Sequence, residues 1–221
     1  MAKSSSARKL TDEPVLAEVR RPAFGGGAPP PPPVRPITPI GSNAWLGTVM
    51  LLGAETMFFA GLIGAFLVFR IGSTVWPPPF QPRLPIGVTG VNTLILLASA
   101  VSMRGALQAS RRADRRGVMR LLSWTAALGT TFLAVQGYEW VRLIHFGLTV
   151  SSSVYGGLFY TLIGFHGVHV LGALLWLFVV WLKARQGVDA KRSTAGLQTC
   201  SMYWIFVVAL WPVLYGLVYL Y

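Results

Sequence analysis

Five long apolar segments, separated by polar or basic connections, constrain this chain more than any other feature. They span residues 44–69, 86–108, 119–144, 154–182 and 199–221. Each one provides the roughly 20 residues that an α-helix needs to cross the hydrocarbon core of a bilayer. The segments lack the two-residue alternation of strands, and backbone groups in lipid must find their hydrogen bonds within the element itself. The sequence therefore predicts an all-α transmembrane bundle of five helices.

Composition supports a membrane setting and argues against a nucleic-acid partner. The chain is 53% hydrophobic and only 12% charged, whereas a soluble domain has about 25% charged residues. Its net charge of +12 comes from basic residues that lie between the apolar runs, not from a basic patch on a soluble surface. The single cysteine, Cys200, rules out an internal disulfide.

The distribution of Lys and Arg predicts how the helices are oriented. Sixteen of these residues lie before the first segment or in the second and fourth connections, and three lie in the alternate connections or beside them: Arg70, Arg83 and Arg142. Because cytoplasmic loops carry the excess of Lys and Arg, we expect the N-terminus in the cytoplasm and the C-terminus outside.

Residues 1–43 contain no apolar run, and residues 25–39 are dominated by Gly and Pro. A proline tract such as residues 29–33 prefers the polyproline II conformation and cannot build a packed core. We therefore expect a disordered cytoplasmic tail over residues 1–43 that serves as a tether, followed by one transmembrane domain over residues 44–221.

Two acidic residues, Glu55 and Glu139, fall inside apolar segments, where an ionisable group needs a partner and usually has a role. Glu55 lies about 16 Å into the first segment, near the midplane, and His166 lies about 20 Å into the fourth from the opposite side. His169 follows one turn deeper. We predict a contact between the first and fourth helices in which Glu55 accepts a hydrogen bond from one of these imidazoles.

Glu139 and Gln136 form a second polar group, one turn apart near the outer end of the third segment. We expect interfacial solvent to reach Glu139 at that position.

His166 and His169 also raise the hypothesis of a haem or metal site, since imidazole is a common ligand of both. Residues three apart point to one side of a helix, whereas two axial haem ligands approach from opposite faces of the porphyrin. The remaining histidine, His145, lies at a segment end, and no further ligand set is evident. We favour paired core histidines and expect no catalytic residue, metal or cofactor in this chain, with a membrane cytochrome as an alternative.

A small transporter is another alternative, in which Glu55 and Glu139 would be proton-coupling carboxylates. That class of protein typically has inverted repeats or interrupted helices. Neither feature is found in the sequence.

Several motifs, read in order, resemble subunit III of haem-copper cytochrome oxidases. They are Ala54-Glu55-Thr56-Met57-Phe58-Phe59-Ala60, Asn92-Thr93 through Ser99, Gln136-Gly137-Tyr138-Glu139-Trp140, Ser153-Val154-Tyr155-Gly156 and Gly164-Phe165-His166-Gly167-Val168-His169-Val170. The resemblance covers residues 44–221 and matches the five-helix form of the family. The last helix departs from the family, which usually has His and Asp where this chain has Ile205 and Val208.

The resemblance implies an accessory, non-redox subunit of a bacterial cytoplasmic (inner) membrane oxidase. Such a subunit binds the haem-copper catalytic subunit I and other oxidase subunits, holds phospholipid in a cleft near Glu55, and supports sustained proton uptake and turnover. Haem and copper would belong to those partner subunits. The subunit III of quinol oxidases and the accessory proteins of nitric oxide reductases are similar alternatives, so the electron donor and the acceptor stay open.

Overall fold

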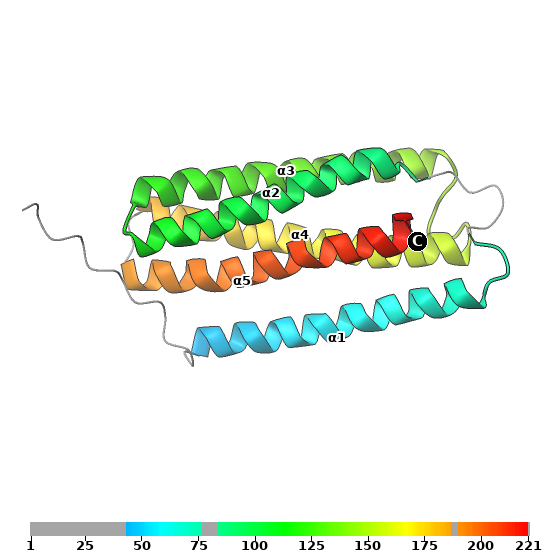
Figure 1. The fold of residues 1–221 in the computed structure, drawn as a ribbon, viewed down its shortest axis with the longest axis horizontal. Coiled ribbons are helices and arrows are strands. Elements are labelled where there is room, and N and C mark those ends of the chain that lie inside the picture. Colours follow the sequence, from blue (N-terminus) through cyan, green and yellow to red (C-terminus); the bar gives the residue numbers. More distant parts are fainter. Residues whose placement is uncertain (1–42, 77–83, 187–189, 221) are drawn as a thin grey trace, which may run out of the picture. The chain divides into compact units, whose positions relative to one another are not determined.

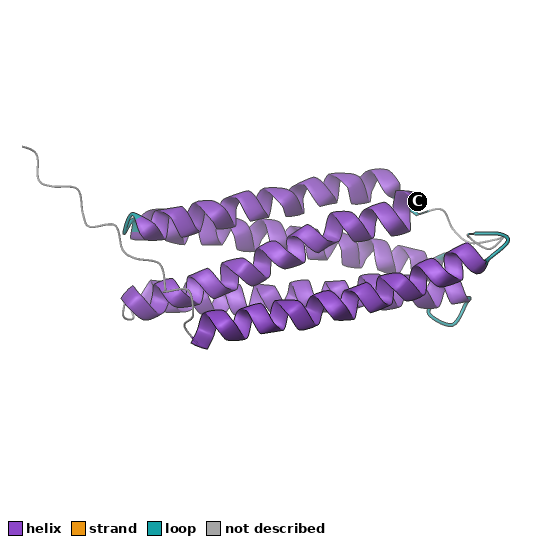
Figure 2. Cartoon of the chain, turned by 60° about the horizontal axis from the view of Figure 1, so that its bottom comes forward, coloured by secondary structure: helices purple, strands orange, loops and turns teal. Residues whose placement is uncertain are grey.

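Five α-helices make up almost all of the residues that the computed structural model describes, which are 43–76, 84–186 and 190–220. The helices are α1 (Asn43–Gly72), α2 (Ile86–Arg111), α3 (Arg115–His145), α4 (Val154–Gln186) and α5 (Ala190–Tyr215), followed by the π-helix η1 (Gly216–Leu220). Within these described ranges there is no strand (Figure 2). The predicted all-α fold is confirmed.

All five helical segments are long and apolar enough to cross a membrane, the fifth span being Thr194–Leu220. The chain is a multi-pass membrane protein. The helices are longer than the predicted segments, because helical hydrogen bonding continues past the apolar stretch into the polar ends. For example, α3 already begins at Arg115 and α5 at Ala190. The predicted tail lies outside the described residues, except that Asn43 begins α1.

Helices α2, α3, α4 and α5 form a four-helix core, in which α2 packs on α3 and α5, and α4 packs on the same two helices. Helix α1 lies outside this core and contacts α5 and α4 (Figure 1). Its buried residues are Thr48, Phe59 and Phe66, so most of its surface is left uncovered by this chain. We call the end of the bundle that holds the start of α1, the α2–α3 turn and the start of α5 the basic end (Figure 1).

Polar side chains of α2 join it to its neighbours inside the core. The Asn92 amide donates to the backbone oxygen of Phe132 in α3 at 3.0 Å. The indole N–H groups of α5 donate to hydroxyls of α2, Trp204 to Ser99 and Trp211 to Thr93. These bonds explain why the motif that begins at Asn92 carries polar residues within an apolar helix, since a buried polar group needs a partner.

Glycines let large aromatic side chains fit between helices. A Cβ atom at Gly129 of α3 would lie 2.5 Å from Cη2 of Trp204, and one at Gly167 of α4 would lie 2.9 Å from Cη2 of Trp140. Small residues at helix contacts allow such close approach. Gly129 and Gly167 therefore lie at tight contacts, whereas a Cβ atom at Gly61, Gly164 or Gly172 would have nothing within 4 Å.

The connections on both sides of α3 are capped by side chains. Asp114 precedes α3 and accepts a hydrogen bond from the backbone N–H of Gly117 at 2.9 Å, which satisfies a donor at the helix start. Before α4, Ser153 accepts from the backbone N–H of Gly156 at 3.1 Å. Gly156 also lies against the carbonyl oxygen of Thr149, where a side chain would clash. The Ser-Val-Tyr-Gly motif therefore shapes the entry into α4.

Candidate functional site

Glu55 of α1 and His169 of α4 form a polar pair where α1 packs on the four-helix core. The Oε2 atom of Glu55 lies 2.7 Å from Nε2 of His169, and the two side chains are 17% and 16% exposed. Glu55 lies twelve residues, or about 18 Å, beyond the start of α1, which places the pair near the middle of the span. The predicted contact between the first and fourth helices is present, and His169 is the imidazole that makes it.

The second ring nitrogen of His169 fixes how this pair shares its proton. Nδ1 lies 2.6 Å from the backbone oxygen of Phe165, and a carbonyl oxygen only accepts, so Nδ1 carries a hydrogen. Nε2 then either donates to a Glu55 carboxylate or accepts from the Glu55 carboxylic acid. Both forms hold one proton between the two residues and are neutral as a pair. The shared proton can therefore move between Glu55 and His169 without leaving a net charge in the membrane.

Aromatic rings surround the pair. The ring centroid of His169 lies 5.1 Å from that of Phe59 and 6.1 Å from that of Phe58, and Phe58 packs edge-on against Phe165 at 5.2 Å. Apolar neighbours lower the local dielectric and strengthen the hydrogen bond between carboxyl and imidazole. All four of these side chains belong to two of the motifs singled out in the sequence, Ala54–Ala60 and Gly164–Val170.

His166 faces a different part of the bundle from His169. It is 1% exposed and stacks on Trp211 of α5 at 5.0 Å, with Phe59 and Phe132 packed edge-on around it. Neither of its ring nitrogens has a protein partner among the described residues. Residues three apart are turned by about 60° around a helix, which is enough to direct one imidazole to α1 and the other into the core.

Gln136 and Glu139 of α3 lie in a separate polar group. The Gln136 amide donates to the hydroxyl of Tyr219 at 3.2 Å, and Arg142 donates to Glu139 at 3.3 Å. Glu139 is 4% exposed. The expectation of solvent access to Glu139 is therefore wrong, because the surrounding helices cover it and its partner is the next turn's Arg142. No contact within the described part of the chain joins this group to Glu55 or His169.

The comparisons with known proteins agree with the motifs. The family model for cytochrome c oxidase subunit III matches residues 38–221. The chain belongs to this family. It is 40% identical over 175 residues to the cytochrome c oxidase subunit 3 of Synechocystis, which covers 79% of this chain and 74% of that protein. It is 34% identical to the probable subunit 3 of Nocardia farcinica and 32% identical to that of Bacillus subtilis, covering 86% and 89% of those proteins.

The described part of this chain brings few metal-binding side chains together. Among residues 43–76, 84–186 and 190–220, no three His, Cys, Asp or Glu side chains come close enough to hold a metal ion. His166 lies against Trp211 and His169 against Glu55, so the two imidazoles do not converge on one point. His169 and Glu55 share a proton, and His166 is a buried ring stacked on Trp211, so neither imidazole is arranged as a metal ligand.

Val208 and Ile205, where the sequence departs from the pattern expected from the resemblance, have different neighbours on α5. Val208 is 2% exposed within the core. Ile205 is partly buried and lines a cleft against α2. Neither apolar side chain can make a polar contact, and the indoles of Trp204 and Trp211 provide the side-chain hydrogen bonds from α5 to hydroxyls of α2.

Sequence reasoning missed three partners of the predicted residues. They are Trp211 beside His166, Tyr219 beside Gln136 and Arg142 beside Glu139. The last one had a signal, since residues three apart on a helix are neighbours. The other two belong to the far end of the chain, and only the packing of α5 and η1 brings them there.

Proposed function

We propose that this chain is the accessory, non-redox subunit III of a respiratory haem-copper terminal oxidase in the bacterial cytoplasmic membrane. It binds the catalytic subunit I and phospholipid, and it supports sustained proton uptake and turnover during aerobic electron transport. Membership of the cytochrome c oxidase subunit III family supports this role. With three histidines and one cysteine, the chain's donor set suits neither a binuclear haem-copper centre nor an electron-entry site, so haem and copper belong to the partner subunits.

The observation that carries the proposal is the Glu55–His169 pair beneath the uncovered surface of α1. On the face of α1 turned away from Glu55, Met50 and Met57 are 68% and 79% exposed, so lipid or a partner helix covers that face of the membrane-embedded helix. A neutral pair that exchanges one proton close to such a surface suits a subunit that maintains proton supply to a neighbour. It also gives a lipid or a partner side chain a polar group to contact.

The names of the relatives favour one donor and one acceptor. All three relatives named above, from three bacteria, are named as cytochrome c oxidase subunits. We therefore infer that cytochrome c, not quinol, is the electron donor of this chain's complex. Oxygen, not nitric oxide, is then the acceptor.

Turnover of the purified complex with and without this chain tests the accessory role. We expect the complex that lacks the chain to start at close to the initial rate of the whole complex and then to lose activity during sustained turnover. Adding back the purified chain should restore the lifetime. An initial rate close to zero in a correctly assembled complex, with its haem spectrum intact, would contradict the accessory role.

A further inference from the structure

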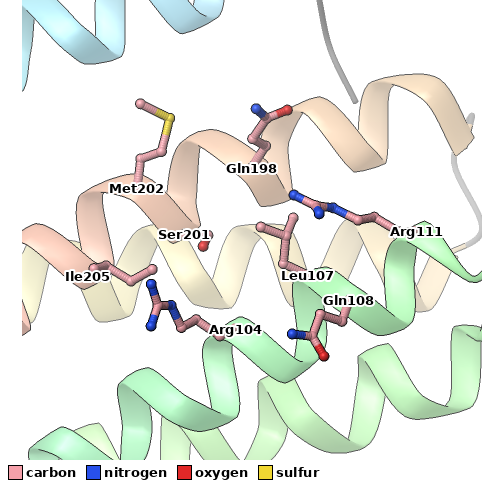
Figure 3. Close-up of a pocket in the computed structure, with 8 residues that line it drawn as sticks. All are labelled: Arg104, Leu107, Gln108, Arg111, Gln198, Ser201, Met202 and Ile205. Carbon is pink, nitrogen blue, oxygen red and sulfur yellow. The ribbon is translucent and has the colours of Figure 1, made fainter. Parts of the chain in front are cut away.

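A cleft lies between α2 and α5 at the basic end of the bundle. Its volume is about 450 Å³. Figure 3 shows the side chains that line it, which come from the last three turns of α2 and the first half of α5. They are Arg104, Leu107, Gln108, Arg111, Gln198, Ser201, Met202 and Ile205. The volume lies within the range of small-ligand sites.

Two guanidinium groups make this cleft cationic. Arg104 and Arg111 are seven residues apart on α2, so they lie on the same face with their Cα atoms about 10 Å apart. Figure 3 shows both side chains directed over the cleft. Neither has an ion-pair partner among the described residues, where the carboxylates of Glu55, Asp114 and Glu139 interact with other groups.

The depth of Arg104 is that of a membrane interface. Ser102, half a turn away, donates to the backbone oxygen of Leu121 in α3, and the indole of Trp181 in α4 donates to Ser123. Tryptophan is enriched where the hydrocarbon core meets the headgroups. Arg104 therefore lies near the level of lipid phosphates, and Arg111 lies about two turns farther out.

A positive charge at this depth in the membrane needs a negative partner. An arginine near the hydrocarbon boundary is costly unless it reaches water or pairs with an opposite charge. Arg104 extends toward the start of α2, as helical side chains do, and so toward Ile205 and the membrane interior (Figure 3). The pairing charge has to come from outside the described part of this chain.

We propose that the cleft binds the phosphate of an anionic phospholipid from the leaflet at the basic end. Arg104 and Arg111 bind the phosphate-bearing headgroup, because the planar guanidinium matches phosphate oxygens with paired hydrogen bonds. An acyl chain then lies along Met202 and Ile205 and over Val101, which is 72% exposed one turn deeper on α2. This site is separate from Glu55 and gives the proposed lipid binding a specific location. It rests on the proposed function only in that the chain lies in a membrane.

The proposal is tested with the full chain purified in detergent, by native mass spectrometry during titration with dioleoylphosphatidylglycerol. Dioleoylphosphatidylcholine and inorganic phosphate are the comparison ligands. The test variants are Arg104→Gln and Arg111→Gln. The matched controls are Arg112→Gln and Arg120→Gln, which remove one charge each from the same end of the bundle without touching the cleft.

We expect one phosphatidylglycerol molecule to bind to the wild type and to both controls with the same affinity. Each test variant should bind it about tenfold more weakly, because each loses a charge-assisted hydrogen bond. Arg104→Lys should recover part of the affinity because it keeps the charge. If the control variants bind phosphatidylglycerol as weakly as the test variants, the proposed site is wrong. That result would show that binding depends only on the total positive charge of this end of the bundle. Displacement of the lipid by millimolar phosphate would overturn the lipid assignment in favour of a soluble anion.

The same variants in the whole complex separate a lipid from a partner's carboxylate. If the cleft holds lipid, purified complexes with Arg104→Gln should contain this subunit in normal amounts but less phosphatidylglycerol. Loss of the subunit together with unchanged lipid binding by the isolated chain would assign the cleft to a partner protein. The accessory role is measured by turnover lifetime, so either proposal can fail without the other.

Discussion

Nε2 of His169 lies 2.7 Å from Oε2 of Glu55, whereas His166, one turn earlier on the same helix, stacks on Trp211 in the core. Two imidazoles three residues apart thus have different neighbours. One shares a proton with a carboxyl group on α1, and the other fills space among aromatic rings. This division gives the two histidines separate and testable roles.

Replacement of Glu55 should reveal how much the pair contributes to stability. Glu55→Gln keeps the shape and a hydrogen-bonding side chain, so we expect a small loss. Glu55→Leu leaves His169 without its partner and should lower the free energy of unfolding by about 1–3 kcal/mol. Thermal unfolding of the purified chain in detergent should show stability falling from wild type to the Gln variant to the Leu variant. A Leu variant as stable as the Gln variant would mean that the hydrogen bond contributes nothing.

A double-mutant cycle should distinguish His169 from His166. His169→Leu combined with Glu55→Leu should cost less than the sum of the two single changes, with a coupling of about 1 kcal/mol, because both remove the same bond. His166→Leu should be additive with Glu55→Leu, since His166 has no contact with Glu55 in the structure. Coupling to His166 and additivity with His169 would reverse the assignment.

A methyl group at Gly129 should destabilise the contact between α3 and α5. A Cβ there would lie 2.5 Å from Cη2 of Trp204, which is 1% exposed and fixed by its bond to Ser99. We expect Gly129→Ala to cost about 1–3 kcal/mol, the usual range for overpacking. Gly137→Ala is the control on the same helix, since nothing lies within 4 Å of that Cβ position. Chemical unfolding of both variants makes the comparison, and equal stability would contradict the packing.

Loss of the Tyr219 hydroxyl should weaken the attachment of η1 to α3. Tyr219 is 6% exposed and accepts the hydrogen bond from the Gln136 amide, so Tyr219→Phe leaves a buried donor without its partner. We expect a loss of about 1–3 kcal/mol. Tyr215→Phe removes a more exposed hydroxyl that donates to the backbone of Ile86, and it should cost less. A larger effect at Tyr215 would argue against the buried bond.

Cysteine labelling should establish the proposed orientation. Cys200 is 2% exposed, so the wild-type chain should react little with a membrane-impermeant maleimide. In sealed right-side-out vesicles, Ser151→Cys in the α3–α4 loop should be labelled, and Ala113→Cys in the α2–α3 turn should react only after the membrane is opened. The basis is the excess of Lys and Arg at the basic end. The opposite pattern would place the N-terminus outside.

The sequence by itself was enough to predict five membrane-spanning helices and to single out Glu55 and the two histidines. Both follow from strong physical constraints. Apolar runs of this length have few folded alternatives in lipid, and an ionisable residue within one needs a partner. Counting along ideal helices also matched the depth of Glu55 to that of the histidines, because each residue of a straight helix advances the chain by a fixed distance.

Only the tertiary structure decided which imidazole meets Glu55, which side chains cover Glu139, and that Arg104 and Arg111 face a cleft against α5. Each of these depends on how helices are rotated about their axes and which neighbours they meet. In lipid that choice follows from close packing, such as Trp204 against Gly129, and from bonds between residues about a hundred positions apart. Such contacts leave no periodic trace in the sequence, because a membrane helix is apolar on every side.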